Sequence, residues 1–176
     1  MRYLLIFLLF SQSVLAQQFL TKTGQASFFS SAPLEDIEAT NNKLAGVVDF
    51  SNGKYAFKIA IQDFVFPNSL MQEHFNESYL ESEKYPYAIF QGQIENFSSI
   101  DLQTKSKVIC KGVFTIHGVS NDVIIESDLQ MIDGVVSIES TFDVLLKDYK
   151  IKIPKIVLYN IAEEIKVSVK ASLKEN

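Results

Sequence analysis

The chain has 176 residues, a formal net charge of −5 at pH 7, 47% hydrophobic residues and one cysteine. A chain of this length typically forms one domain, and a single cysteine excludes an internal disulfide. The acidic balance does not supply the basic surface that nucleic-acid binding needs, so nucleic acid is not an expected partner.

The first residues have the three-part pattern of an export signal. Arg2 supplies a positive charge, an apolar run extends from Tyr3 to Phe10, and small residues precede Gln17. The apolar run is much shorter than the ~20 residues of a membrane-spanning helix. We therefore expect cleavage after Ala16, no membrane span, a periplasmic or secreted product, and a single domain over residues 17–176.

Alternating apolar and polar residues predict strands over residues 26–30, 37–39, 44–50 and 55–61. Asn41-Asn42 suggests a turn between two of these strands. Asn52-Gly53 is a stronger hairpin signal, because both residues tolerate the left-handed backbone of a tight turn. The strand that follows has four large apolar residues on one face, namely Tyr55, Phe57, Ile59 and Ile61.

A segment with helical periodicity then interrupts the strands. Ser69 and Gln72 match a capping box, which would satisfy free amides at a helix start. Apolar and aromatic residues follow at three- and four-residue spacings, and they are Leu70, Met71, His74, Phe75 and Tyr79. The sequence predicts one short helix near residues 69–80.

Further strands are predicted near residues 87–97, 107–117, 123–132, 136–146 and 165–173, with a tight turn at Asp133-Gly134. Regularly spaced antiparallel strands without intervening crossover helices are typical of a barrel or a sandwich. We favour the barrel, because closure removes the exposed edges of strands rich in Val and Ile. The expected fold class is an all-β antiparallel barrel of about eight strands with one short helix.

The inward faces of these strands alternate large and small residues. Gly46, Ala88, Gly92, Gly112 and Ser140 are small residues among many large ones. An eight-stranded barrel is either filled by side chains or holds one small ligand. Small inward residues favour a cavity, but they are equally consistent with strand bends and tight packing, so this pattern alone leaves both interiors open.

No motif for catalysis or metal binding is present. Nucleophile elbows, phosphate-binding loops and paired His-Glu metal motifs are absent. Cys110 has apolar neighbours on its own strand face and is expected to be a small core residue. We expect a protein that is not an enzyme, with no metal and no cofactor.

Two blocks of sequence carry a resemblance to a known family. They are residues 70–90, LMQEHFNESYLESEKYPYAIF, and residues 112–119, GVFTIHGV. Both resemble the YceI family of exported bacterial proteins, and the resemblance extends over nearly the whole domain. The family's usual Asp-x-x-His-Ser opening is replaced here by Thr23 to Ser27.

The resemblance implies a lipocalin-like barrel that holds a polyisoprenoid or a similar long amphiphilic lipid in its interior, as a carrier or a store. The candidate wall residues are Phe57, Ile59, Ile61, Phe64, Leu70, Met71, Phe75, Phe90, Phe114, Ile116 and Phe142. Three further residues are candidates for polar contacts near an opening, namely His74, Tyr79 and His117.

Two other functions remain open at this point. A filled barrel would be an envelope interaction module that binds another protein and no small molecule. An enzyme acting on a lipid, a hydrolase or an isomerase, has less support because no nucleophile–base pair can be named. The sequence leaves a homodimer open, and it does not define the length or head group of the lipid.

Overall fold

The computed structural model of the chain describes residues 17–31, 36–153 and 162–176. The predicted export signal, residues 1–16, lies outside the described residues, so cleavage and export remain predictions. No helix within the three described ranges is long and apolar enough to cross a membrane.

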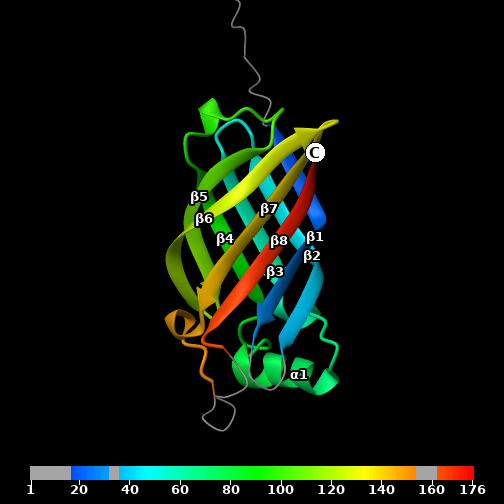
Figure 1. Cartoon of the computed structure of the whole chain (residues 1–176), viewed down its shortest axis with the longest axis vertical. Coiled ribbons are helices and arrows are strands. Elements are labelled where there is room, and N and C mark those ends of the chain that lie inside the picture. The colour runs from blue at the N-terminus through cyan, green and yellow to red at the C-terminus, as the bar shows by residue number, and fades with distance from the viewer. Residues whose placement is uncertain (1–16, 32–35, 154–161) are drawn as a thin grey trace, which may run out of the picture.

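Eight antiparallel strands close into a barrel, in which each strand pairs with its neighbours in chain order and the last pairs with the first (Figure 1). This confirms the predicted all-β barrel. The strands are β1 (Gln18–Ser30), β2 (Ile37–Asp49), β3 (Lys54–Ala60), β4 (Tyr87–Ile94), β5 (Ser106–Ile116), β6 (Val119–Ile132), β7 (Val135–Leu145) and β8 (Glu164–Glu175).

Two-residue turns connect the long hairpins. At Asp133-Gly134 the φ angles are 49° and 75°, and at His117-Gly118 they are 52° and 70°. Positive φ at both positions is typical of the hairpin turn whose twist matches that of the strands. The turn at Asp133-Gly134 was predicted. The turn at His117-Gly118 was not, and β6 consequently begins at Val119 rather than near residue 123.

The predicted turn at Asn41-Asn42 is wrong, because β2 continues through both residues. They lie where the pairing of β1 with β2 changes register. The buried Asn41 side chain donates to the carbonyl oxygen of Ala60 at 2.8 Å and accepts from the Lys43 amide at 2.8 Å. Asn41 thus satisfies backbone groups at a bulge within a long strand.

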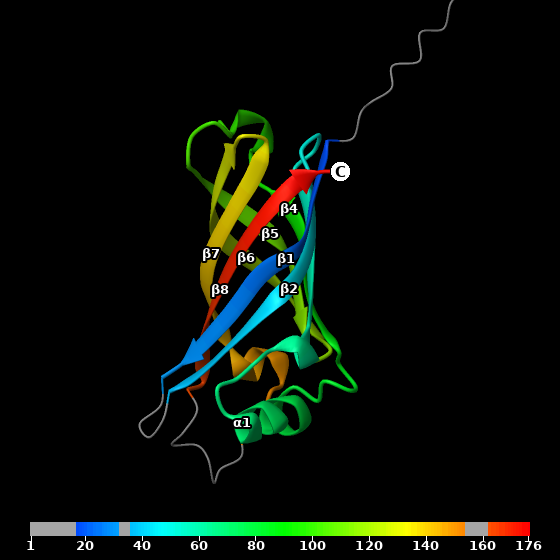
Figure 2. The same ribbon diagram turned by 90° about the vertical axis from the view of Figure 1, so that its right-hand side faces the viewer.

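The predicted helix is confirmed as α1 (Ser69–His74), which continues into a π-helical turn, η2 (Phe75–Tyr79). Its cap differs from the expected one: the Asn68 side chain, not Ser69, accepts from the amides of Leu70 and Met71. The Gln72 side chain accepts from the Phe66 amide instead. The helix lies across one end of the barrel (Figure 2).

The buried apolar residues form two clusters along the barrel axis. One cluster fills the end opposite the helix and includes Phe19, Val48 and Leu129. The other lies toward the helix and includes Ile61, Phe64 and Tyr149, the last from a short 3-10 turn, η4 (Leu146–Tyr149). Phe57 packs against both clusters, so it marks the boundary between the packed end and the helix end.

Candidate functional site

The barrel interior contains a cavity of about 520 Å³. That volume lies within the roughly 300–1,000 Å³ of typical ligand pockets. The cavity is bordered by Val48 and Leu129 toward the packed end and by Met71 and His74 of α1 at the other end. Since the His74 side chain is exposed, the helix end is where the cavity meets solvent.

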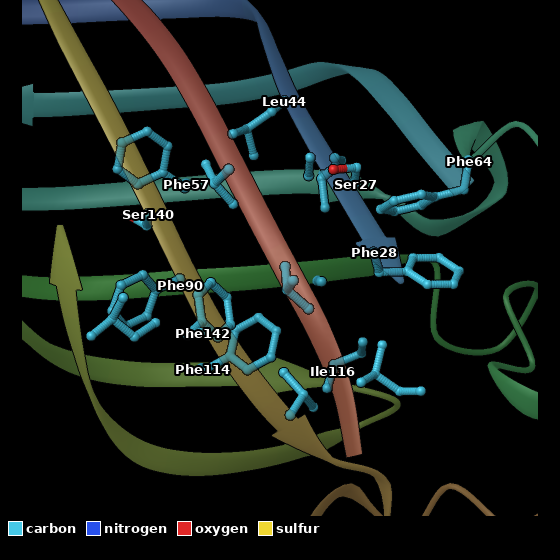
Figure 3. Close-up of a pocket in the computed structure, with 18 of the residues that line it drawn as sticks. Ser27, Phe28, Leu44, Phe57, Phe64, Phe90, Phe114, Ile116, Ser140 and Phe142 are labelled. Carbon is cyan, nitrogen blue, oxygen red and sulfur yellow. The ribbon is translucent and has the colours of Figure 1, made fainter. Parts of the chain in front are cut away.

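Phenylalanines from four strands form the middle of the cavity wall (Figure 3). Phe57, Phe90 and Phe114 are direct cross-strand partners on β3, β4 and β5. The ring of Phe142 on β7 lies 6.0 Å from that of Phe114 in an edge-on arrangement. All four rings point into a closed barrel yet keep some accessible surface, because the space between them is not filled.

The small inward glycines do not create this space. A methyl group at Gly46 would lie 2.2 Å from the Phe57 ring, and the sites of Gly92 and Gly112 are occupied by strand backbone. None of the three lines the cavity, whereas Ala88 and Ser140 do. The room therefore does not come from the glycines, whereas the small side chains of Ala88 and Ser140 do border it.

A second aromatic cluster covers the helix end. Phe28 of β1 lies 5.5 Å, 5.7 Å and 5.4 Å, ring centre to ring centre, from Phe64, Phe66 and Phe75. These four residues join β1, the segment after β3 and the π-helical turn. Their rings form an apolar cluster at the helix end of the cavity, which we call the rim.

Two polar side chains of the helical segment border the cavity at this rim. The side chain of His74 projects from α1, and that of Tyr79 from the turn behind it. Burial raises the pKa of Tyr79, so its hydroxyl remains a neutral hydrogen-bond donor at physiological pH. No Asp, Glu, Lys or Arg of the described residues lines the cavity.

Twelve of the fourteen predicted site residues line this one cavity, and two do not. The twelve are Phe57, Ile59, Ile61, Phe64, Met71, His74, Phe75, Tyr79, Phe90, Phe114, Ile116 and Phe142. Whether each of them contacts a ligand remains a prediction.

Leu70 and His117 lie outside the cavity wall, contrary to the expected arrangement. Leu70 is 56% exposed because it is on the outer side of α1. His117 Nδ1 donates to the carbonyl oxygen of Tyr149 at 3.0 Å, and its Nε2 lies 2.9 Å from a carboxylate oxygen of Glu81. His117 thus holds loops together outside the cavity.

Several lining residues were not among the candidate wall residues. Phe28, Val167 and Val169 lie on the inward face of their strands, so alternation alone could have identified them. Phe66 and Ile151 lie in irregular segments that fold back over the barrel end. No periodic signal marks residues of that kind.

The deeper wall contains one sulfur and several hydroxyls but no reactive arrangement. Burial raises the pKa of the Cys110 thiol, which keeps the thiol neutral and unreactive. Within the described part of the chain, no three His, Cys, Asp or Glu side chains are placed to hold a metal ion.

Comparison with known proteins links this architecture to one family. Residues 19–173 match the model of the YceI-like domain. No curated protein is similar enough in sequence to count as a match.

Three solved structures have the same fold. A polyisoprenoid-binding domain from Saccharophagus degradans, implicated in plant cell wall breakdown, is 13% identical with a TM-score of 0.79, covering 92% of this chain and 99% of that one. BcnA from Burkholderia cenocepacia is 14% identical with a TM-score of 0.72, covering 85% and 95%. A YceI protein from Campylobacter jejuni is 18% identical with a TM-score of 0.60, covering 76% and 81%.

Proposed function

The chain belongs to the YceI-like family, and from that premise we propose that it binds a polyisoprenoid or a similar long amphiphile inside its barrel. The Saccharophagus degradans domain of the same fold binds polyisoprenoids. At 13% identity that likeness shows the fold alone, so the ligand proposed for this chain depends on the chemistry of its own cavity.

The observation that carries the proposal is a cavity inside the barrel, reaching from Leu129 to His74 of α1, with an almost entirely apolar wall. Burying several hundred Å² of a hydrocarbon chain contributes on the order of 10 kcal/mol at ~25 cal/mol per Å². Part of that is lost because the ligand gives up translational and conformational freedom. The remainder is sufficient for stable retention of a flexible apolar chain, and no covalent step is required.

The rim supports an entry route at the helix end. Phe28 and Phe75 offer an apolar path to the interior, while His74 and Tyr79 offer polar contacts beside it. We propose that the protein acts after export, in the periplasm or outside the cell, as a carrier or a store. The export pattern of residues 1–16 is the support for that location.

A filled-barrel interaction module fits the interior less well. That alternative needs side chains that pack the barrel throughout, whereas the phenylalanine rings of the middle section border a cavity of about 520 Å³. No observation favours a catalytic role over binding.

Mass spectrometry of organic extracts tests the proposal. The full chain is expressed in a bacterial host that exports it, purified without detergent, and extracted with chloroform and methanol. We expect prenyl-chain lipid in near-equimolar amount, and none from an unrelated exported protein purified in parallel. Absence of any such lipid, together with failure of the purified protein to take up added prenyl lipid, would contradict the proposal.

A further inference from the structure

A strip of polar groups crosses the otherwise apolar deep part of the cavity. Cys110, Ser127 and Ser140 lie on β5, β6 and β7, and their inward side chains are linked in a row. Cys110 Sγ lies 3.6 Å from Ser127 Oγ, and Ser127 Oγ lies 2.6 Å from Ser140 Oγ. All three line the cavity. Ser140 is two residues before Phe142, on the side away from the rim (Figure 3).

The hydrogen bonds within this row do not use all of its hydrogens. Each of the three groups carries one hydrogen, and the row contains two hydrogen bonds. One hydrogen is therefore unused within the row, and it is that of Ser140 when Cys110 donates to Ser127 and Ser127 donates to Ser140. Ser140, at one end, is only half-buried although it lies inside a closed barrel, so its accessible surface faces the cavity.

Tyr55 places a second unused donor at the same depth. Its side chain is 6% exposed and lines the cavity, and its hydroxyl has no hydrogen-bond partner among the described residues. The hydroxyl reaches across the backbone of Gly112, so that a methyl group there would lie 2.8 Å from it. A buried donor without an acceptor costs free energy, and a ligand oxygen would satisfy it after a small movement of the ring.

The surroundings limit what kind of oxygen can bind there. Among the described residues that line the cavity there is no lysine or arginine to neutralise a phosphate or a carboxylate. Burying an unpaired charge at this depth costs far more than burying a neutral hydroxyl or carbonyl group. The strip therefore suits a neutral acceptor and excludes an anionic head group.

We propose that Tyr55, Ser127 and Ser140 form a deep polar subsite that binds a neutral hydroxyl or carbonyl oxygen of the ligand. This inference rests on the proposed function, because it assumes that an apolar chain occupies the cavity. A neutral prenyl lipid enters with its oxygen-bearing end first. A prenyl phosphate binds in the opposite direction, with its charged end at the rim near His74.

Three ligands that share the same hydrocarbon tail test the subsite, with the whole protein as the binding partner. They are geranylgeraniol, its monophosphate, and the hydrocarbon that has a methyl group in place of the hydroxymethyl group. Affinities are measured by competition with a fluorescent lipid. The test variants are Tyr55→Phe and the double variant Ser127→Ala/Ser140→Ala. The control is Ser168→Ala, a serine on the outer face of β8.

We expect each test variant to lose roughly three- to tenfold in affinity for geranylgeraniol, the effect of one net hydrogen bond. Affinities for the hydrocarbon and the monophosphate should not fall, and Ser168→Ala should change none of the three. Equal loss for all three ligands, or no loss for the alcohol, would overturn the subsite. If the wild-type protein binds none of the three, the proposed function itself fails.

Discussion

Gly92 and Gly112 are direct partners on β4 and β5, at a point where the two backbones approach closely. A methyl group at Gly92 would lie 2.0 Å from the Lys111 carbonyl oxygen and 2.5 Å from Gly112 Cα. Backbone atoms of a paired strand cannot move aside as a flexible side chain can. Glycine is required here for close strand packing, and it leaves no room for a ligand.

Replacing Gly92 with alanine should therefore destabilise the barrel strongly. We expect Gly92→Ala to lower the free energy of unfolding by about 2–4 kcal/mol, as for other overpacked positions. Gly134→Ala is the matched control, because nothing lies within 4 Å of its added methyl group and only its φ of 75° is unfavourable. The control should lose about 1–2 kcal/mol. Urea unfolding compares the two, and equal losses would contradict the close approach at Gly92.

Such positions show what strand alternation can and cannot predict. Alternation correctly placed Gly92 and Ala88 on the inward face of β4. It could not show whether the space in front of a small residue is empty, because that space is decided by the neighbouring strand. Gly46 is covered by the Phe57 ring and Gly92 by backbone, so these glycines do not mark the cavity, whereas Ala88 and Ser140 do line it.

The hairpin between β5 and β6 is tied to two loops through one side chain. The His117 ring is 10% exposed, bonds to Tyr149 and Glu81, and packs edge-on against Tyr85 with ring centres 4.7 Å apart. Tyr149 follows β7, and Glu81 follows the helix at the rim. His117 thus fixes the position of elements that surround the cavity opening.

We expect His117→Asn to lower the free energy of unfolding by about 1–3 kcal/mol, the usual cost of losing buried hydrogen bonds. Asparagine is chosen because it accepts the φ of 52° at this turn. His74→Ala, at an exposed rim position, should change stability by less than about 0.5 kcal/mol. Thermal and urea unfolding measure both variants. Wild-type stability in His117→Asn would show that the link contributes little.

Some of the turns between strands were predicted correctly and others were not, and the residue types at each turn explain the difference. Asn52-Gly53 and Asp133-Gly134 contain the residue types that favour positive φ, and both are turns. Histidine is less usual in that conformation, so His117-Gly118 was missed. Asn41-Asn42 has the composition of a turn, yet Asn41 satisfies backbone groups inside a bulged strand. Composition cannot separate those two uses of asparagine.

The whole barrel should lose stability in alkaline solution. Burial raises the pKa of Cys110 above its ordinary value of 9.0 and that of Tyr55 above 10.0. The folded protein therefore keeps protons that the unfolded chain releases, and its free energy of unfolding falls as pH rises above about 9. Each group contributes at most about 1.4 kcal/mol per pH unit.

Unfolding by urea between pH 7 and pH 11 measures this dependence. Replacing both groups, as Cys110→Ala with Tyr55→Phe, should flatten the alkaline decline relative to the wild type. An unchanged slope in the double variant would show that other groups cause the decline.

The all-β fold was predictable because most of the strands have an alternating pattern, which is typical of a barrel or a sandwich. The covering of the barrel end was predictable only in part, because the helix near residues 69–80 has a periodic signal of its own. Phe66 lies in the irregular segment between β3 and β4, and Ile151 lies in the one that follows β7. Only the folded arrangement brings them to the cavity. The family resemblance thus implied the cavity and the strand and helix patterns identified most of its wall, while Phe66 and Ile151 depended on tertiary packing.

Occupation of the cavity can be tested by filling it. Val167 on β8 lines the cavity between its cross-strand partners Phe28 and Phe142, and it is only half-buried. A phenylalanine at this position has room to extend into the void. Ser168, the next residue, faces the outside of the barrel and offers a matched control.

The most direct measurement is the affinity of the full chain for a prenyl lipid in Val167→Phe and Ser168→Phe, with urea unfolding of the same samples. We predict that Val167→Phe loses at least about tenfold in affinity, because the ring excludes the lipid from the space it needs, and remains within about 1 kcal/mol of wild-type stability. Ser168→Phe should bind normally. Undiminished binding in a folded Val167→Phe would contradict a ligand held inside the barrel.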